Sequence, residues 1–545
     1  MTLDSPARTS KTWAWTVLLV LLLALRLPAI VRPAGGDQNL YTYIAQRVTA
    51  GDVPYRDAWE QKPPAIFFVY AAFLPVAPVE RLVGVADFTA AAIGAWLLVL
   101  LGRRMFGGHV GEGAAAVLLV LGDPGIQRLG GMNFRAQCET FIGLAITGAL
   151  LLAWRRSPRP WHLVATGVCL ALACWLKYNA ILFALPIALA VAWPGDVAWS
   201  PRKFLASAAW ITAGALGLSA IFLGYFIASG AFTDLWLATI GYNLRYSGET
   251  YAGAMDAVSY VVTLPFDHAK VDGLWFVGLL GAVLVLGFTR ASRTSLIVLV
   301  WIAAAIFSIA LNGRRGLPQY FLQAAPALAL AASAGLAAMW RARREARLIA
   351  IGVAALLLAG LWRVGVESVP RYQPRVFGLP QTMENIAADL RYLKGETPRE
   401  VYLARFDRNE GGKFSPLAVE RLAARANSLA APSDRIYVFG FSGGGVLVRA
   451  GRVSASRFFW SRPVVIEFEA GRPGYGSAGL LADLMRNPPA VVALQKHDWG
   501  LGEKAAGTLD SIRFFLDNPA LRAWLESGYV PDYEDDVYAV WRRKS

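Results

Sequence analysis

The sequence predicts an α-helical polytopic membrane protein with about eleven spans, followed by an extracytoplasmic α/β domain. Hydrophobic residues make up 56% of the 545 residues, and the mean hydropathy is +0.43. Charged residues make up 17%, below the usual quarter. Apolar runs near the roughly 20 residues that cross a bilayer recur as far as residue 366. Beyond it the chain is charged and turn-rich, so we predict a membrane module at 1–366 and a second domain at 367–545.

The net charge of +15 follows the pattern of membrane topology. Arginine and lysine collect in short loops between apolar runs, as the positive-inside rule requires. No basic patch is interleaved with aromatic residues in the way that base stacking needs. The charge therefore excludes nucleic acid as a partner and indicates membrane lipids instead.

The positions of the basic clusters also set the number of crossings. If every cluster is cytoplasmic, neighbouring clusters are separated by an even number of spans. Three apolar runs lie between the first basic cluster, at 8–11, and the second, at 103–104, so one of the three cannot cross the membrane. The short, proline-rich run 64–79 is therefore predicted as an interfacial or re-entrant helix. Eleven spans then place the N-terminus inside and the C-terminal domain outside. These spans are 13–31, 83–101, 110–122, 134–153, 161–176, 179–192, 204–228, 274–288, 295–311, 320–340 and 348–366.

The C-terminal domain alternates β-rich runs with helical patterns, which predicts a small α/β domain. Gly443-Gly444-Gly445 follows a predicted strand but lacks the spacing of a nucleotide-binding fingerprint. We interpret it as a turn and assign it no nucleotide. The predicted strands are 435–441, 463–469, 490–494 and 537–542, and the predicted helices are 415–430, 478–486 and 510–527.

Several basic residues at the outer boundary have no topological explanation. Each one alone is explained by a side chain that reaches up to solvent or lipid phosphate. For Lys62 and the pair Arg314 and Arg315 we favour binding of an anionic group, because both residue types bind phosphate well. The full set is Lys62, Arg128, Arg135, Lys177, Arg314 and Arg315.

Two acidic residues are candidates for chemistry. Asp37 follows the first span and has no obvious local partner, so it suits a general base for a hydroxyl or amine nucleophile. Glu139 lies inside the start of a span, where a carboxylate is costly unless it is paired. An ion pair with Arg135, four positions earlier, and a role in the site both remain open.

Metal and triad chemistry find little support in the sequence. The four histidines are scattered without metal-ligand spacing, which argues against a zinc site. A Ser-His-Asp arrangement is not indicated either. We assign no cofactor, and a divalent metal would lack a clear ligand set.

The first outer loop, 33–82, carries a recognisable order of features. Gly35-Gly36-Asp37-Gln38 is followed by Tyr-x-Tyr-Ile-Ala-Gln and by Gly-x-x-Pro-Tyr-Arg-Asp-x-Trp-Glu-x-Lys-Pro-Pro at 51–64. This loop resembles the first periplasmic loop of GT-C fold membrane glycosyltransferases, in particular bacterial protein-mannosyltransferase-like and aminoarabinose-transferase-like proteins. The stretches 176–179, 313–326 and 434–440 are similar to weaker motifs of the same families. Gln38 and Gln319 replace the glutamate and histidine that these families often carry, so the resemblance does not extend to a metal ligand set.

The resemblance implies a bacterial cytoplasmic-membrane enzyme that uses a sugar on a polyprenyl phosphate at the outer face. Lipid, glycan and protein acceptors all stay open. The implied reaction inverts the anomeric carbon. The implied roles are general base for Asp37, second acidic residue for Glu139, phosphate contacts for Lys62, Arg314 and Arg315, and possible substrate contacts for Tyr55, Glu60, Lys177 and Tyr320.

Three other functions compete with this interpretation. A transporter or flippase of a lipid-linked sugar also needs many spans, but no broken repeats in matching halves are visible. A non-catalytic surface protein would not need eleven spans as an anchor. A ligase that moves a whole glycan from a polyprenyl carrier would use the same features as the glycosyltransferase.

Overall fold

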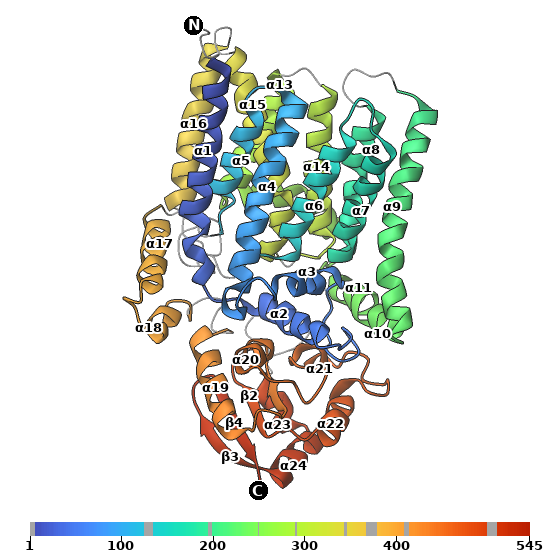
Figure 1. The fold of residues 1–545 in the computed structure, drawn as a ribbon, viewed down its shortest axis with the longest axis vertical. Coiled ribbons are helices and arrows are strands. Elements are labelled where there is room, and N and C mark those ends of the chain that lie inside the picture. The colour runs from blue at the N-terminus through green and yellow to red at the C-terminus, as the bar shows by residue number, and fades with distance from the viewer. Residues whose placement is uncertain are drawn as a thin grey trace. The chain divides into compact units, whose positions relative to one another are not determined.

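The computed structural model describes residues 6–124, 134–193, 199–248, 250–288, 292–314, 316–342, 346–366, 379–407, 414–498 and 510–544 (Figure 1). The chain divides into two compact units, each assembled from three segments. We call Met1–Arg32, Val83–Gly224 and Thr250–Leu393 the helical module. We call Pro33–Leu82, Tyr225–Glu249 and Lys394–Ser545 the mixed unit.

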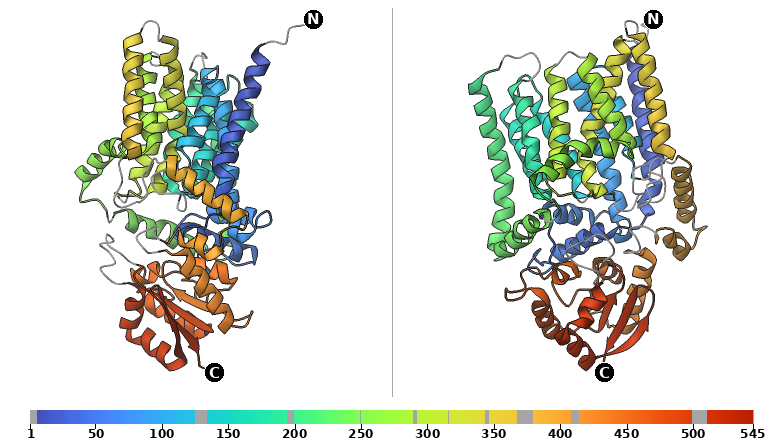
Figure 2. Two further views of the ribbon diagram at one scale, coloured as in Figure 1. Left: turned by 90° about the vertical axis from the view of Figure 1, so that its left-hand side faces the viewer. Right: turned by 180° about the vertical axis from the view of Figure 1, so that it is seen from behind.

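The helical module consists of helices that run alongside one another (Figures 1 and 2). Short 3-10 segments interrupt the α-helices at several of the predicted run boundaries. The elements are α1 Pro6–Arg26, η1 Pro28–Val31, α4 Leu82–Phe106, α5 Val110–Leu121, α6 Cys138–Ala153, α7 Pro160–Leu176, η3 Tyr178–Phe183, α8 Ala184–Ala192, α9 Pro201–Ala228, α12 Ala254–Ala269, α13 Gly273–Phe288, α14 Arg293–Ala310, η5 Pro318–Ala324, α15 Ala325–Ala342, α16 Arg347–Val366 and α17 Leu379–Leu393.

The apolar helices confirm a mostly helical membrane fold. Within the described residues, five segments are long and apolar enough to cross a membrane, or up to six if the bent pair α12 and α13 forms one span. Shorter apolar helices occupy the predicted runs 110–122, 134–153, 161–176, 179–192 and 348–366. The count of eleven crossings stays a prediction. The helix at the run 64–79, α3 (Ala65–Phe73), has nine residues, which is too short to cross alone.

Small residues bring the helices of the module into close contact. A Cβ at Gly281 of α13 would lie 2.4 Å from the Ala332 Cα of α15, and a Cβ at Gly335 would lie 2.3 Å from the Gly281 carbonyl oxygen. The same holds between α4 and α5, where a Cβ at Gly102 would lie 2.5 Å from the Gly111 Cα. Backbones that approach this closely gain dispersion contacts where lipid supplies no hydrophobic driving force.

Helix α9 shows the opposite character and presents apolar side chains outward. Only 11% of the most apolar stretch of this helix is buried inside the protein. Leu216, Ile221 and Ile227 are each more than 60% exposed. Such a surface suits contact with lipid chains rather than with water.

The mixed unit contains the first loop and a four-stranded sheet of order β1-β2-β4-β3. Strand β1 (Ile436–Phe439) pairs parallel with β2 (Val491–Gln495), while β4 (Tyr538–Arg543) pairs antiparallel with β2 and with β3 (Tyr529–Glu534). Its helices are α2 Gly36–Thr49, α3 Ala65–Phe73, α10 Phe232–Trp236, α11 Tyr242–Gly248, α18 Arg399–Ala404, α19 Pro416–Leu429, α20 Gly443–Ala450, α21 Arg462–Val465, α22 Gly476–Arg486, α23 Ser511–Asp517 and α24 Pro519–Gly528, with a π-helix at Leu237–Gly241.

Three predictions for the C-terminal elements are wrong. In the run 463–469, residues 463–465 belong to helix α21 and 466–469 form turns, since Pro463 in the first helical turn lacks the N–H that a central strand needs. The predicted helix 510–527 is two helices, because Asn518 caps α24 ahead of Pro519. Gly443-Gly444-Gly445 is the first turn of α20 and not a loop turn.

The compact units differ from the predicted division at residue 366. The first loop groups with the C-terminal residues because its aromatic side chains are buried among theirs. Trp59 is fully buried, and its ring centroid lies 5.2 Å from that of Tyr242 and 5.8 Å from that of Phe468. Helix α17 groups with the helical module instead, where Asp389 accepts a 2.8 Å hydrogen bond from Arg32. Residues 367–378, at the predicted boundary itself, lie outside the described residues.

Candidate active site

The mixed unit brings Asp37 and Lys62 together. Asp37 lies in the first turn of α2, where the partial positive charge of the helix terminus favours a carboxylate. Its Oδ2 is 3.9 Å from the Nζ of Lys62. The two side chains are 23% and 14% exposed, so a polar ligand can reach both. A carboxylate and an ammonium group therefore meet at an accessible position, as their predicted roles require.

The main chain around Lys62 is held by two of the other predicted site residues. The hydroxyl of Tyr55 donates a 2.7 Å hydrogen bond to the Lys62 carbonyl oxygen, and the Glu60 carboxylate accepts one from the Lys62 N–H. Tyr55 and Glu60 are both fully buried. Tyr55 also adopts a φ of 71°, which is strained for a bulky side chain. Burial and geometry indicate that these residues fix the turn that presents Lys62.

Glu139 and Lys177 form a buried pair in the helical module. The Nζ of Lys177 donates to Glu139 Oε1 at 2.5 Å and to Asn312 Oδ1 at 3.3 Å. It also lies 3.8 Å from the centroid of the Tyr320 ring, within the range of a cation–π contact. The side chains of Glu139 and Lys177 are 1% and 8% exposed. These contacts join α6, the junction of α7 and η3, the end of α14, and η5.

Arg135 has other partners than the proposed ion pair with Glu139. Its guanidinium group donates to the carbonyl oxygens of Ala29 at 2.7 Å and of Arg32 at 2.9 Å. Arg135 is 1% exposed. It therefore fixes the chain that follows α1, while Lys177 supplies the positive charge next to Glu139.

Arg314 is more accessible than Lys62. Its side chain is 54% exposed and pairs with Asp256. Its backbone N–H donates to the Thr250 hydroxyl at 2.9 Å. The neighbouring Arg315 lies outside the described residues.

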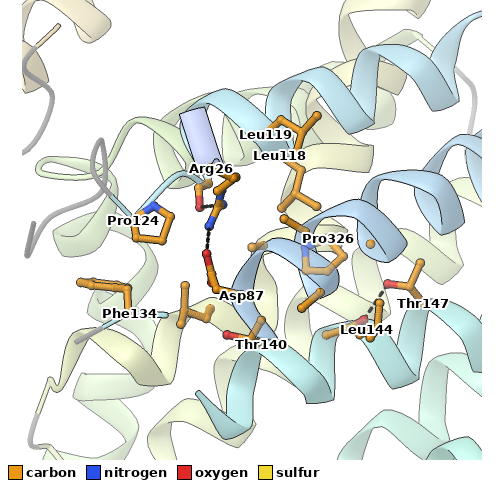
Figure 3. Close-up of a pocket in the computed structure, with 17 residues that line it drawn as sticks. Arg26, Asp87, Leu118, Leu119, Pro124, Phe134, Thr140, Leu144, Thr147 and Pro326 are labelled. Carbon is orange, nitrogen blue, oxygen red and sulfur yellow. Dashed lines mark hydrogen bonds and ion pairs between the residues drawn. The ribbon is translucent and has the colours of Figure 1, made fainter. Parts of the chain in front are cut away.

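A cavity of about 70 Å³ in the helical module holds a charged group that sequence reasoning missed (Figure 3). Arg26 points toward Asp87, with 2.7 Å between Nη1 and Oδ2, and its Nε is 3.0 Å from Asp123. The rest of the lining is mostly apolar and comes largely from α4, α5, α6 and α15, with the hydroxyl groups of Thr140 and Thr147 among it. Arg26 and Asp87 stand inside predicted spans, and a charge inside a span is itself a signal of function or pairing.

Metal chemistry gains no site from the geometry. In the part of the chain that the structure describes, no three His, Cys, Asp or Glu side chains gather where a metal ion could bind. The ammonium group beside Asp37 would also repel a cation at that carboxylate.

The chain has the GT-C fold that the resemblance of the first loop predicted. The chain is similar to ArnT from Cupriavidus metallidurans, solved bound to undecaprenyl phosphate, with a TM-score of 0.58, 14% identity and 98% coverage of each chain. The apo state of the same protein matches with a TM-score of 0.58 and 15% identity over 98% of each chain. The AglB oligosaccharyltransferase of Archaeoglobus fulgidus covers 98% of this chain and 74% of its own at 13% identity, but its TM-score of 0.46 is too low to establish a shared fold. No protein-family model and no curated protein sequence matches this chain.

Proposed function

We propose that this protein is an inverting glycosyltransferase that moves a sugar from a polyprenyl phosphate to an acceptor at the outer face of the bacterial cytoplasmic membrane. The observation that carries the proposal is the accessible pair of Asp37 and Lys62, 3.9 Å apart. The fold supports it, because the similar ArnT was solved with undecaprenyl phosphate. The donor of this chain would have the same chemistry, a single phosphate on a long isoprenoid.

Lys62 and Asp37 would divide the chemistry between them. Lys62 binds the donor phosphate as a point charge and stabilises the negative charge that grows on it. Asp37 accepts the proton of the acceptor hydroxyl or amine. A bond forms between the acceptor atom and the anomeric carbon while the bond from that carbon to the phosphate oxygen breaks. The electron pair leaves with the polyprenyl phosphate, which needs no proton, so one base is enough.

Binding of the donor would change the contact between the Lys62 and Asp37 side chains. Without donor, the ammonium group of Lys62 lies 3.9 Å from the Asp37 carboxylate, so each side chain has the other as its charged neighbour. A bound phosphate attracts the same ammonium group, and the carboxylate is then available to the acceptor. Arg314, which pairs with Asp256 at an exposed position, is a further candidate for a phosphate contact.

The test is the product of the enzyme in its native host. Mass spectrometry of envelope lipids, glycans and proteins should show one modification that Asp37→Asn removes. Asp52→Asn is the matched control, because Asp52 lies in the same loop and pairs with Arg47 at 2.6 Å. If the Asp37→Asn variant restores the modification fully, the proposed mechanism is wrong. A lipid-linked sugar that crosses the membrane without transfer, equally in both variants, would favour the flippase.

The orientation of the chain is part of the proposal. Eleven crossings place the N-terminus in the cytoplasm, and the mixed unit, with Asp37 and Lys62, outside. A fusion of alkaline phosphatase, which is active only outside the cytoplasm, should be active at residue 545. An inactive fusion together with an active cytoplasmic reporter at the same position would contradict this topology.

A further inference from the structure

The three consecutive glycines at 443–445 lie where the C-terminal sheet meets the first loop. They form the first turn of α20, which packs against α2 within the mixed unit (Figure 1). A Cβ at Gly444 would lie 3.0 Å from Leu40 Cδ2, and a Cβ at Gly445 would lie 3.1 Å from Asn39 Nδ2. Both distances are shorter than ordinary contacts of a Cβ atom. The glycines therefore allow α2 to approach α20 closely.

A second contact reaches the residue next to Asp37. A Cβ at Gly36 would lie 2.7 Å from the ring of Phe441, so the ring covers the start of α2. The Phe441 N–H donates to Asp498 Oδ2 at 3.0 Å, and the N–H and hydroxyl of Ser511 donate to the same carboxylate at 2.9 and 2.6 Å. Asp498 is fully buried. The segment that follows β1 is thus anchored to the segment that follows β2.

We infer that the C-terminal domain is the positioning element for the catalytic carboxylate: the glycine turn of α20, with Phe441, sets where the first turn of α2 holds Asp37. This inference rests on the proposed function. Gly444 and Phe441 are positioning residues, since neither takes part in the reaction itself.

Asp37 and Lys62 have different immediate supports in the mixed unit. Tyr55 and Glu60 hold the main chain at Lys62, and the nearby Trp59 packs against Phe468 of the C-terminal domain. The first turn of α2 is fixed by α20 and Phe441. A displacement of α2 therefore changes the distance from Asp37 to the reacting atoms more than the grip of Lys62 on the donor. A misplacement of about 1 Å can cost on the order of 10²-fold in rate.

The substitution Gly444→Ala tests this separation. We expect kcat to fall by about 10- to 100-fold while KM for the donor changes less than about 3-fold. Alanine is the better helix former, so lower helix propensity cannot explain a loss. Gly471→Ala is the control, because a Cβ there meets nothing within 4 Å. Leu40→Val removes the nearest atom that the new Cβ meets, Leu40 Cδ2 at 3.0 Å, and in the Gly444→Ala background it should restore part of kcat.

A readout without activity accompanies the kinetics. Trypsin should cleave the first loop, which contains Arg47 and Arg56, faster in Gly444→Ala than in Gly471→Ala or the wild type. Unchanged kcat and unchanged cleavage in Gly444→Ala would overturn the inference. A lower kcat together with a higher KM and a lower thermal stability, none of them rescued by Leu40→Val, would overturn it as well. If the wild-type protein transfers no sugar, the proposed function fails, and the cleavage rates alone decide whether α20 holds α2.

Discussion

The buried pair of Lys177 and Glu139 gives the most quantitative prediction. Lys177→Met removes the ammonium group and leaves the Glu139 carboxylate, 1% exposed, without its 2.5 Å partner. Breaking a buried ion pair from one side costs about 3–5 kcal/mol. The contact of Lys177 with the Tyr320 ring, at 3.8 Å, adds about 0.5–2 kcal/mol to the loss. We therefore expect the free energy of unfolding in detergent to fall by about 3.5–7 kcal/mol.

The double variant separates a structural pair from a substrate site. Lys177→Met with Glu139→Gln removes both charges together, so most of the lost stability should return. The assay is unfolding in a mixed-micelle titration for the wild type, the two single variants and the double variant. Single variants that are as stable as the wild type, but bind donor weakly, would refute the structural interpretation. They would support the predicted site roles of Glu139 and Lys177 instead.

Three further predictions concern the mixed unit and the packing of the helices. Tyr55→Phe removes the 2.7 Å hydrogen bond to the Lys62 carbonyl oxygen, which is worth about 1 kcal/mol, so KM for the donor should rise several-fold. An unchanged KM in steady-state kinetics would contradict this prediction. Gly281→Val forces α13 away from α15, so the yield of folded protein in size-exclusion chromatography should fall sharply, whereas Gly287→Val, with open space at its Cβ, should not change it. Burial alone would raise the pKa of Glu420, but hydrogen bonds such as that from Arg399 hold this pKa below its ordinary value of 4.5. The ionised Glu420 therefore stabilises the fold above pH 4.5, and this stabilisation is lost as the pH falls further. The thermal midpoint of Glu420→Gln should therefore lie below that of the wild type at pH 7 and approach it in acid, and an equal gap at both pH values would refute this.

The sequence predicted best what depends on nearby residues. Apolar runs are local, and nearly all of them became helices at the expected positions. Asp37 and Lys62 stand 25 positions apart in the same loop, so a motif within that loop could indicate both.

Partners that are distant in the sequence could not be found in the same way. The i,i+4 spacing suggested Arg135 as the partner of Glu139, but tertiary packing places Lys177 there, 38 positions away. The Nε1 of Trp460 donates to the Trp59 carbonyl oxygen across 401 positions, and no pattern within either segment indicates that contact. The prediction of a strand at 463–469 failed for a similar reason. Its two valines favour a strand, but the proline before them lies in the first turn of a helix.

The discontinuous make-up of the mixed unit has a consequence for how the protein is made. Residues 33–82 leave the ribosome first, but the residues that bury Trp59 belong largely to 394–545. On the order of 300 residues separate the two segments, which takes on the order of half a minute at about 5–20 residues per second. During that interval the loop exposes aromatic surface and lacks the contacts that set Asp37. Under the proposed function, a nascent chain is therefore inactive until residues 394–545 have been made and have packed against the first loop.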